Sequence, residues 1–244
     1  MSTVMNILAA SLHNDIDQMR VAASNMANAD VVGYRQQVGV PQSDFSQVAA
    51  AVTGGAAPGV AGASAPQMAV AVDTRPGALK STGEPLNVAL QGNGYFVVST
   101  ARGELLTRRG DFRLDPSGTL CAFSGDPVLG TEGVIRIKGG TPQISADGSI
   151  RVANQLVGQL DIVQPAPGAT LQPAGGGFLV SSTGQVAAGA GTQVLQGFVE
   201  GSNVSPVNQM VMLMQATRHF EASQRFVRAY DSMLDNAITD LGKV

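Results

Sequence analysis

The stretch SPVNQMVMLMQATRHFEASQRFVRAYDSMLDNAITDL, residues 205–241, decides the fold of this chain. Large apolar residues recur in it every seven positions, and a second row follows three positions later. This spacing is typical of a helix that packs lengthwise on another helix, so it predicts a long helix with a narrow packing seam. The first row is Leu213, Phe220, Val227, Leu234 and Leu241, and the second is Ala216, Ser223, Tyr230 and Ala237.

Both ends of this predicted helix carry boundary signals. Ser205 offers an N-cap hydroxyl, and Pro206 stands at the first helical position, where its missing N–H costs nothing. Neither Gly nor Pro follows until Gly242, which is typical of a helix end. The predicted helix, Pro206 to Leu241, would be about 55 Å long. An ordinary amphipathic helix covering a globular core is the alternative interpretation of the same pattern.

The N-terminal region, about Thr3 to Asn28, carries a looser version of this seam. Its apolar positions are spaced by threes, fours and sevens, but poor helix formers such as Asp15 and Asn25 interrupt them. Such a helix is marginal alone in water, so we expect it to fold when another surface covers its seam. The seam positions are Met5, Leu8, Leu12, Met19, Ala23 and Met26.

The region from Leu86 to Val199 has the pattern of β structure. Gly94–Ser99 and Val134–Lys138 are strand candidates, and Gly- and Asp-containing turn signals separate short apolar runs. This favours an antiparallel barrel-like or sandwich-like domain. The predicted fold class is therefore α+β, with the terminal helices packing as a coiled-coil-like pair and the β domain inserted between them.

We place the boundaries of this organisation at composition changes. Residues 49–71 are mostly Ala, Gly, Val and Pro with a few polar residues and without charged or aromatic side chains, which indicates a flexible or extended connector. The predicted parts are an N-terminal assembly helix (1–35), a connector (36–80), a β domain (81–200) and a C-terminal assembly helix (201–244).

Composition and motifs give no support for catalysis. Only 14% of the residues are charged, the net charge is −3, and the longest cationic cluster is Arg108-Arg109, which does not suggest nucleic-acid binding. The single Cys121 lies in an apolar run, where a buried small hydrophobe is expected. His13 and His219 lie on the predicted helices, with no Cys or carboxylate at metal-ligand spacing. We predict no catalytic, cofactor or metal site and no small-molecule substrate.

Targeting signals are also missing. No Lys or Arg precedes residue 20, the apolar run Ile7–Ala10 is too short for a secretory signal, and no run has the length of a membrane span. General export would therefore leave the chain in the cytoplasm, although specialised export leaves no such mark.

Five blocks of the chain resemble, in order, the rod and hook proteins of the bacterial flagellum. They are residues 25–35, 73–98, 106–120, 127–130 and 196–207, and together they span nearly the whole chain. The motif positions that carry the resemblance are Asn25, Asn28, Gly33, Tyr34, Gly92, Gly94, Gly201, Asn203 and Pro206.

This resemblance implies a structural subunit of the flagellar basal-body rod. The single β domain is closer to the proximal rod member of the family, with the distal rod member as the alternative. Its partners would be other rod subunits and further copies of itself, in the periplasm, after export by the flagellar secretion apparatus. The assembly interface would be Met5, Leu8, Leu12, Met19, Met26, Leu213, Phe220, Val227, Tyr230, Leu234 and Leu241.

A different class of protein is also open at this point. A secreted β adhesin or fibre-like binding module with coiled-coil ends would have the same helix and strand pattern. Such a module should expose a recognition patch of aromatic side chains, whereas Tyr95 and Phe96 lie in a strand-like run.

Overall fold

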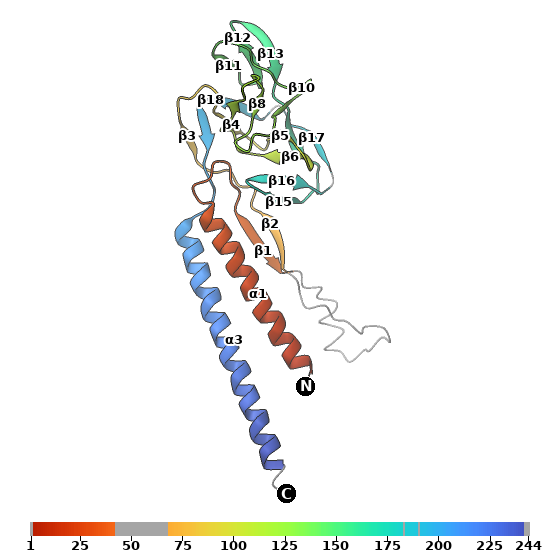
Figure 1. Cartoon of the computed structure of the whole chain (residues 1–244), viewed down its shortest axis with the longest axis vertical. Helices are drawn as coiled ribbons and strands as arrows, with labels where there is room; N and C mark the ends of the chain where they lie inside the picture. Colours follow the sequence, from red (N-terminus) through yellow and green to blue (C-terminus); the bar gives the residue numbers. More distant parts are fainter. Residues whose placement is uncertain (1, 42–67, 183, 190, 242–244) are drawn as a thin grey trace, which may run out of the picture. The chain divides into compact units, whose positions relative to one another are not determined.

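The structure is a computed structural model that describes residues 2–41, 68–182, 184–189 and 191–241 (Figure 1). It shows an α+β chain with a helix near each end and antiparallel strands between them. The chain divides into two compact units, which are described separately. The helical unit draws on Met1–Met26, Val38–Val70 and Pro206–Val244, and the β unit on Ala27–Gln37 and Ala71–Ser205.

The helical unit contains the two predicted helices. Helix α1 spans Ser2–Ala27 and ends before Asn28, and helix α3 spans Pro206–Leu241, so the predicted end of α1 and start of α3 are confirmed. Gly242, the predicted end signal of α3, lies outside the described residues. Strands β1 (Gln37–Pro41) and β2 (Met68–Val72) form a two-stranded sheet. They occupy part of the predicted connector 36–80, most of whose Ala- and Gly-rich stretch lies outside the described residues.

The β unit is built on a six-stranded sheet with the order β15-β16-β6-β5-β14-β17, in which every pairing is antiparallel. Smaller sheets of two or three strands complete it. Over the described residues no sheet closes into a barrel, so the barrel-like or sandwich-like layout stays a prediction. The strands are β3 (Leu79–Ser81), β4 (Val88–Gln91), β5 (Tyr95–Thr100), β6 (Gly103–Thr107), β7 (Arg113–Leu114), β8 (Leu120–Cys121), β9 (Leu129–Gly130), β10 (Gly133–Val134), β11 (Pro142–Ile144), β12 (Ser149–Val152), β13 (Gln155–Gln159), β14 (Ile162–Pro165), β15 (Leu171–Gly175), β16 (Phe178–Ser181), β17 (Gln185–Ala187), β18 (Gln193–Gln196) and β19 (Phe198–Glu200).

Strand β5 is buried on both faces and organises the core of this unit. Its alternate side chains Phe96 and Val98 enter the larger apolar cluster, while Tyr95 and Val97 enter a smaller one. Phe96 meets Phe112 edge to face, with ring centroids 5.0 Å apart, an arrangement that aromatic rings prefer. The predicted strand Gly94–Ser99 is thus confirmed to within one residue.

The predicted strand Val134–Lys138 is wrong in extent. Only Gly133–Val134 forms a strand, although Ile135 and Ile137 are buried and alternate with exposed neighbours. Their backbone groups bond to the segment around Leu120 instead of to a continuous partner strand. The alternation of apolar and polar residues correctly predicts which side chains face the core. It does not predict whether a partner strand pairs with this segment.

A buried carboxylate, Glu200 at the end of β19, joins three distant segments of the β unit. Its Oε1 lies 2.8 Å from Arg35 Nη2, and its Oε2 lies 3.2 Å from Arg108 Nη1. All three residues are at most 4% exposed. The Arg35 contact is a close charge pair rather than an aligned hydrogen bond, while Arg108 Nη1 also donates to the carbonyl of Leu90. We call this cluster of Arg35, Arg108 and Glu200 the Glu200 junction.

Backbone contacts reinforce the Glu200 junction. The N–H of Gly77 donates to Glu200 Oε1 at 2.9 Å, and the N–H of Gly33 donates to the Glu200 carbonyl at 2.7 Å. Burial lowers the pKa of Arg108, and the carboxylate of Glu200 opposes that shift. The segment that leaves α1 and the segment that leads to α3 are therefore fixed side by side within the β unit.

We predict that Glu200→Ala destabilises the full-length chain by about 3–5 kcal/mol, because removing one partner leaves buried guanidinium charges uncompensated. Urea unfolding followed by circular dichroism measures this loss. The matched control is Glu132→Ala, which removes an exposed carboxylate from the same unit. Equal stability of the two variants would show that the junction does not hold the unit together.

Candidate assembly surface

Helices α1 and α3 lie side by side and run antiparallel within the helical unit (Figure 1). The residue numbers of contacting pairs rise along one helix as they fall along the other. In this register, α3 continues past the start of α1 by roughly 13 Å, given the rise of a helix. The contacts that set it are Asn25 Nδ2 to Gln209 Oε1 (3.1 Å), Thr217 Oγ1 to Met19 Sδ (3.7 Å) and His219 Nδ1 to both carboxylate oxygens of Asp15 (2.8 Å).

The seam rows of α3 are its less exposed positions. Ala216 is buried, and the other described seam residues are partly buried, whereas most remaining side chains of α3 are exposed. Partial burial is expected where a single neighbouring helix covers a seam. The partly buried seam residues are Leu213, Phe220, Ser223, Val227 and Tyr230, and the side chains of Leu234, Ala237 and Leu241 lie outside the described ones.

The seam of α1 differs from the expected one. Met5 and Ala23 are exposed, and Leu8, Leu12, Met19 and Met26 are partly buried. The most buried side chains are instead Asp15, Val21, Ala22 and Asn25.

Polar residues at the helix contact were missed by the sequence analysis. Asp15 and Ala22 continue the seven-residue row that starts at Leu8, and Gln209 stands seven positions before Ala216. Asp15 and Gln209 are polar and so break the apolar pattern, although their spacing fits the seam. Asn25 and Gln209 are both nearly inaccessible and satisfy each other by a hydrogen bond, which is how buried amides are tolerated.

The two histidines each face a carboxylate, which corrects the sequence analysis. His13 lies 3.5 Å from Asp17, one helical turn away, and His219 lies against Asp15 on the other helix. Among the described residues no group of three His, Cys, Asp or Glu side chains could hold a metal ion. These pairs are therefore contacts of the helices, not parts of a metal cluster within that portion of the chain.

The N-terminal motif residues lie where α1 passes into the β unit. Gly33 has a φ of +65°, and a Cβ there would stand 2.4 Å from the backbone nitrogen of Arg109, so only glycine fits. Tyr34 is buried, and Asn28 accepts from the N–H of Val31 through its carbonyl just after the end of α1.

The C-terminal motif residues surround the Glu200 junction. Asn203 Oδ1 accepts from the N–H of Gln36, and its Nδ2 donates to the carbonyls of Asp73 and Arg75. The N–H of Gly201 donates to the carbonyl of Ala78. Asn203 thus ties the same segments that Glu200 ties.

The glycine motif between β4 and β5 contacts Arg108 of the Glu200 junction. The carbonyl of Gly92 accepts from Arg108 Nη2, and Gly94 is buried where a Cβ would meet Ile162 at 2.6 Å. Pro206 is the first residue of α3. The motif residues thus lie at chain crossings, at turns and near the ends of the two helices.

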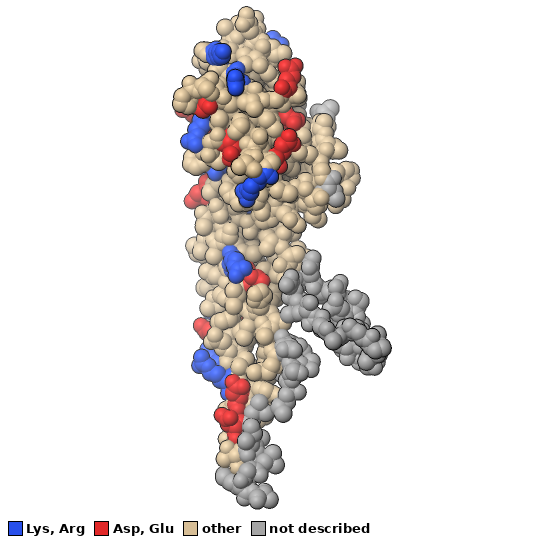
Figure 2. All heavy atoms as spheres, turned by 45° about the vertical axis from the view of Figure 1, so that its right-hand side comes forward, with Lys and Arg blue, Asp and Glu red and all other residues tan. Residues whose placement is uncertain are grey.

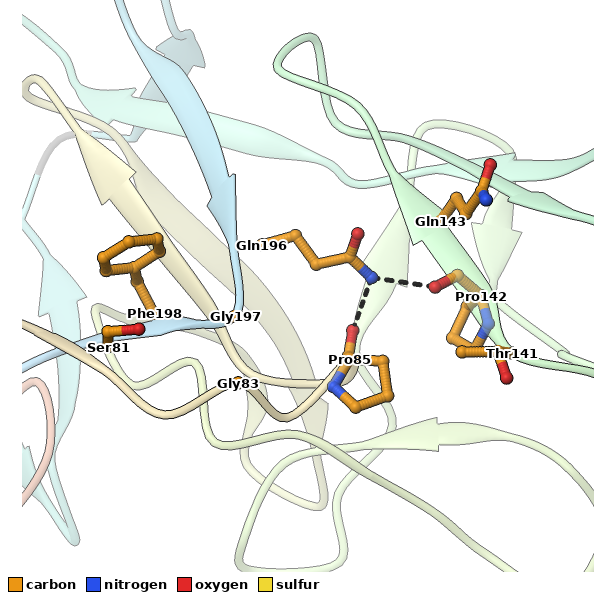
Figure 3. Close-up of a pocket in the computed structure, with 9 residues that line it drawn as sticks. All are labelled: Ser81, Gly83, Pro85, Thr141, Pro142, Gln143, Gln196, Gly197 and Phe198. Carbon is orange, nitrogen blue, oxygen red and sulfur yellow. Dashed lines mark hydrogen bonds between the residues drawn. The ribbon is translucent and has the colours of Figure 1, made fainter.

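A shallow pocket of about 410 Å³ lies in the β unit between β3, β11, β18 and β19 (Figure 3). None of the nine residues that line it is titratable. The amide of Gln196 points into it, but its nitrogen donates to the carbonyls of Pro85 and Pro142, and its oxygen accepts from the N–H of Ile144. The polar group at its centre is already satisfied, so the pocket offers a ligand little chemistry.

Charge and burial fit a structural surface. Figure 2 shows positive and negative side chains interspersed on the visible face, without a continuous patch of either sign. Cys121 is buried, and burial raises the pKa of its thiol, which disfavours the reactive thiolate. No helix in the described part of the chain is long and apolar enough to cross a membrane.

Comparison with known proteins identifies the family. Residues 195–240 match the family described as flagellar basal body rod FlgEFG protein C-terminal, and residues 89–153 match the flagellar hook protein FlgE/F/G D1 domain. The chain is 34% identical to the flagellar basal-body rod protein FlgF of Mesorhizobium japonicum, over 90% of each chain. It is 33% identical to FlgF of Escherichia coli, over 91% of this chain and 90% of the relative.

The chain is also similar to a second rod protein of this family. The flagellar basal-body rod protein FlgG of Bacillus subtilis is 28% identical over 94% of this chain and 95% of the relative. Together these matches show a structural protein of the flagellar rod and hook class. The chain belongs to the flagellar basal-body rod protein family.

We predict that His219→Ala lowers the stability of the helix pair by about 1–2 kcal/mol, because it removes the partner of a buried carboxylate. His219→Gln can still donate to Asp15 and should cost less. Urea unfolding monitored at 222 nm, where helices dominate, measures the difference. The control is His13→Ala, which removes an exposed imidazole that pairs with Asp17 within α1. A loss as large as that of His219→Ala would contradict this role for the interhelical contact.

We also predict that Cys121 is protected from thiol reagents in the folded chain. A maleimide should label it only in denaturant, because the side chain is buried and its thiol pKa is raised. Mass spectrometry counts the label. Rapid labelling of the native chain would show an exposed or activated thiol.

Proposed function

We propose that the chain is a structural subunit of the proximal rod of the bacterial flagellar basal body. The observation that carries this proposal is the pair of terminal helices, which form a unit of their own apart from the β unit. Helices at both ends of a chain, with the β unit between them, can pack between copies while the β unit keeps its own core. The two FlgF relatives described above support the proximal position.

The proposed mechanism is non-catalytic assembly. The helix pair of each copy packs in a coiled-coil-like manner against helices of neighbouring rod subunits, and contacts that do not close on themselves extend a tube. The subunit would reach the periplasm through the flagellar secretion apparatus, and its partners would be rod proteins and other copies. The proposed assembly residues are the seam positions of α1 and α3.

A distal rod position is the second candidate. The similarity to FlgG of Bacillus subtilis covers nearly the whole of both chains and favours it. Antibody labelling of isolated basal bodies separates the two, since a proximal subunit should be labelled on the cytoplasmic-membrane side of the rod.

We predict that Phe220→Asp abolishes motility while the β unit stays folded. The substitution replaces a seam side chain, whose burial contributes about 2 kcal/mol, with a carboxylate that resists burial. Gln215→Asp, at an exposed position of the same helix off the seam, is the matched control. Soft-agar motility of a deletion strain carrying each variant gives the readout, with circular dichroism of the purified chains. Full motility of both variants would refute assembly through this seam.

A further inference from the structure

Helix α3 presents a second apolar stripe on the face turned away from its seam. Val207, Met210, Val211 and Met214 follow the spacing i, i+3, i+4, i+7 and so share one face. They are 42–69% exposed, which is unusual for four neighbouring large apolar side chains. No charged residue occurs between Gly201 and Thr217. We call these four residues the upper patch.

A second exposed apolar patch lies further along the same helix, on a face rotated from the first. Ala222, Phe226, Ala229 and Met233 are all exposed, Phe226 by 55% and Met233 by 58%. Their spacing of four, three and four positions again places them on one side of the helix. We call these four residues the lower patch.

Three residues of each patch match in size at an offset of fifteen positions. This shift along α3 sets Val207 against Ala222, Val211 against Phe226 and Met214 against Ala229, while the fourth residue of each patch falls against an arginine, Met210 against Arg225 and Met233 against Arg218. Two of these pairs oppose a larger side chain to alanine, so the surfaces can interdigitate. The shift corresponds to about 22 Å along the helix axis.

The distribution of methionine suggests that the helical unit makes intermolecular contacts. All nine methionines lie within the sequence ranges of the helical unit. Methionine is flexible and polarisable, so it adapts to surfaces that differ slightly from one contact to the next. Such adaptability suits a subunit whose copies occupy similar but not identical positions.

The area of the patches excludes a stable isolated dimer. Four half-exposed side chains make a patch on the order of 300 Å², whereas a stable interface buries about 800 Å² on each partner. The contact therefore suits a polymer, in which several small contacts hold each copy at once. Because the two halves of the contact are different surfaces, it is head-to-tail and does not close after two copies.

We propose that the upper patch of α3 docks on the lower patch of α3 in a second copy of this chain, with the two helices parallel and staggered by about 22 Å. This inference rests on the proposed rod function. It adds a specific pair of surfaces on α3, both away from its seam with α1, and a register between them.

Engineered disulfides test this register in basal bodies isolated from the bacterium that carries the gene. The full chain would carry Val211→Cys and Phe226→Cys together with Cys121→Ala. Within one copy the two positions are about 22 Å apart on a rigid helix, whereas a disulfide requires Cα atoms within about 7 Å. Any bond must therefore join two copies. Oxidation should produce a ladder of dimers and higher multimers on a non-reducing gel.

Two controls and one alternative pair define the result. Val211→Cys alone should stay monomeric, and so should Val211→Cys with Arg228→Cys, which moves the second thiol around the helix. If Phe226→Cys impairs motility, Met214→Cys with Ala229→Cys tests the same offset with a milder change. A ladder from either patch pair, absent from both controls, supports the proposal.

Other outcomes overturn it in distinguishable ways. If the chain is present in basal bodies but both patch pairs stay monomeric, the register is wrong and the rod function stands. Dimers from Val211→Cys alone would mean that two upper patches meet, and a cross-link to a different basal-body protein would mean another occupant. Absence of the wild-type chain from basal bodies would refute the rod function and this inference with it.

Discussion

The carboxylate of Glu200 sets a constraint on which the arrangement of the chain depends. It pairs with two buried guanidinium groups, Arg35 and Arg108, and its backbone and side chain bond to Gly33 and Gly77. A buried charge that loses its partner is costly, so these segments cannot separate without a large penalty. The segment following α1 and the segment preceding α3 are therefore held together within the β unit.

Within the helical unit, α1 and α3 pair through a seam that combines apolar and polar contacts. An all-apolar seam would tolerate shifts in register, whereas the hydrogen bond between Asn25 and Gln209 and the contact between Asp15 and His219 each require one alignment. Polar residues in helix contacts can specify register at some cost in stability. The pair thus presents a defined outer surface, which a subunit that repeats in a polymer needs.

The sequence predicted local features well and long-range ones poorly. Pro206 is the first residue of α3 and Asn28 follows the last residue of α1, and both boundaries were predicted correctly because helix ends depend on local backbone chemistry. The role of Gln209 in the seam was not predicted, because a polar residue does not fit an apolar pattern until its hydrogen-bond partner is known. The Glu200 junction was not predicted, because it links residues that are far apart in the sequence. The order of strands in the sheets depends on the same kind of long-range pairing. The role of the seam in assembly stays a prediction, because it concerns neighbouring molecules.

Cryo-electron microscopy of basal bodies isolated from the bacterium that carries the gene tests the account most directly. A map at side-chain resolution would show which part of each copy makes the contacts between subunits. The account predicts that α1 and α3 lie in the wall of the rod and contact helices of neighbouring subunits, with the β unit folded around the Glu200 junction. A rod in which only β units touch, while both helices remain free of neighbours, would contradict it.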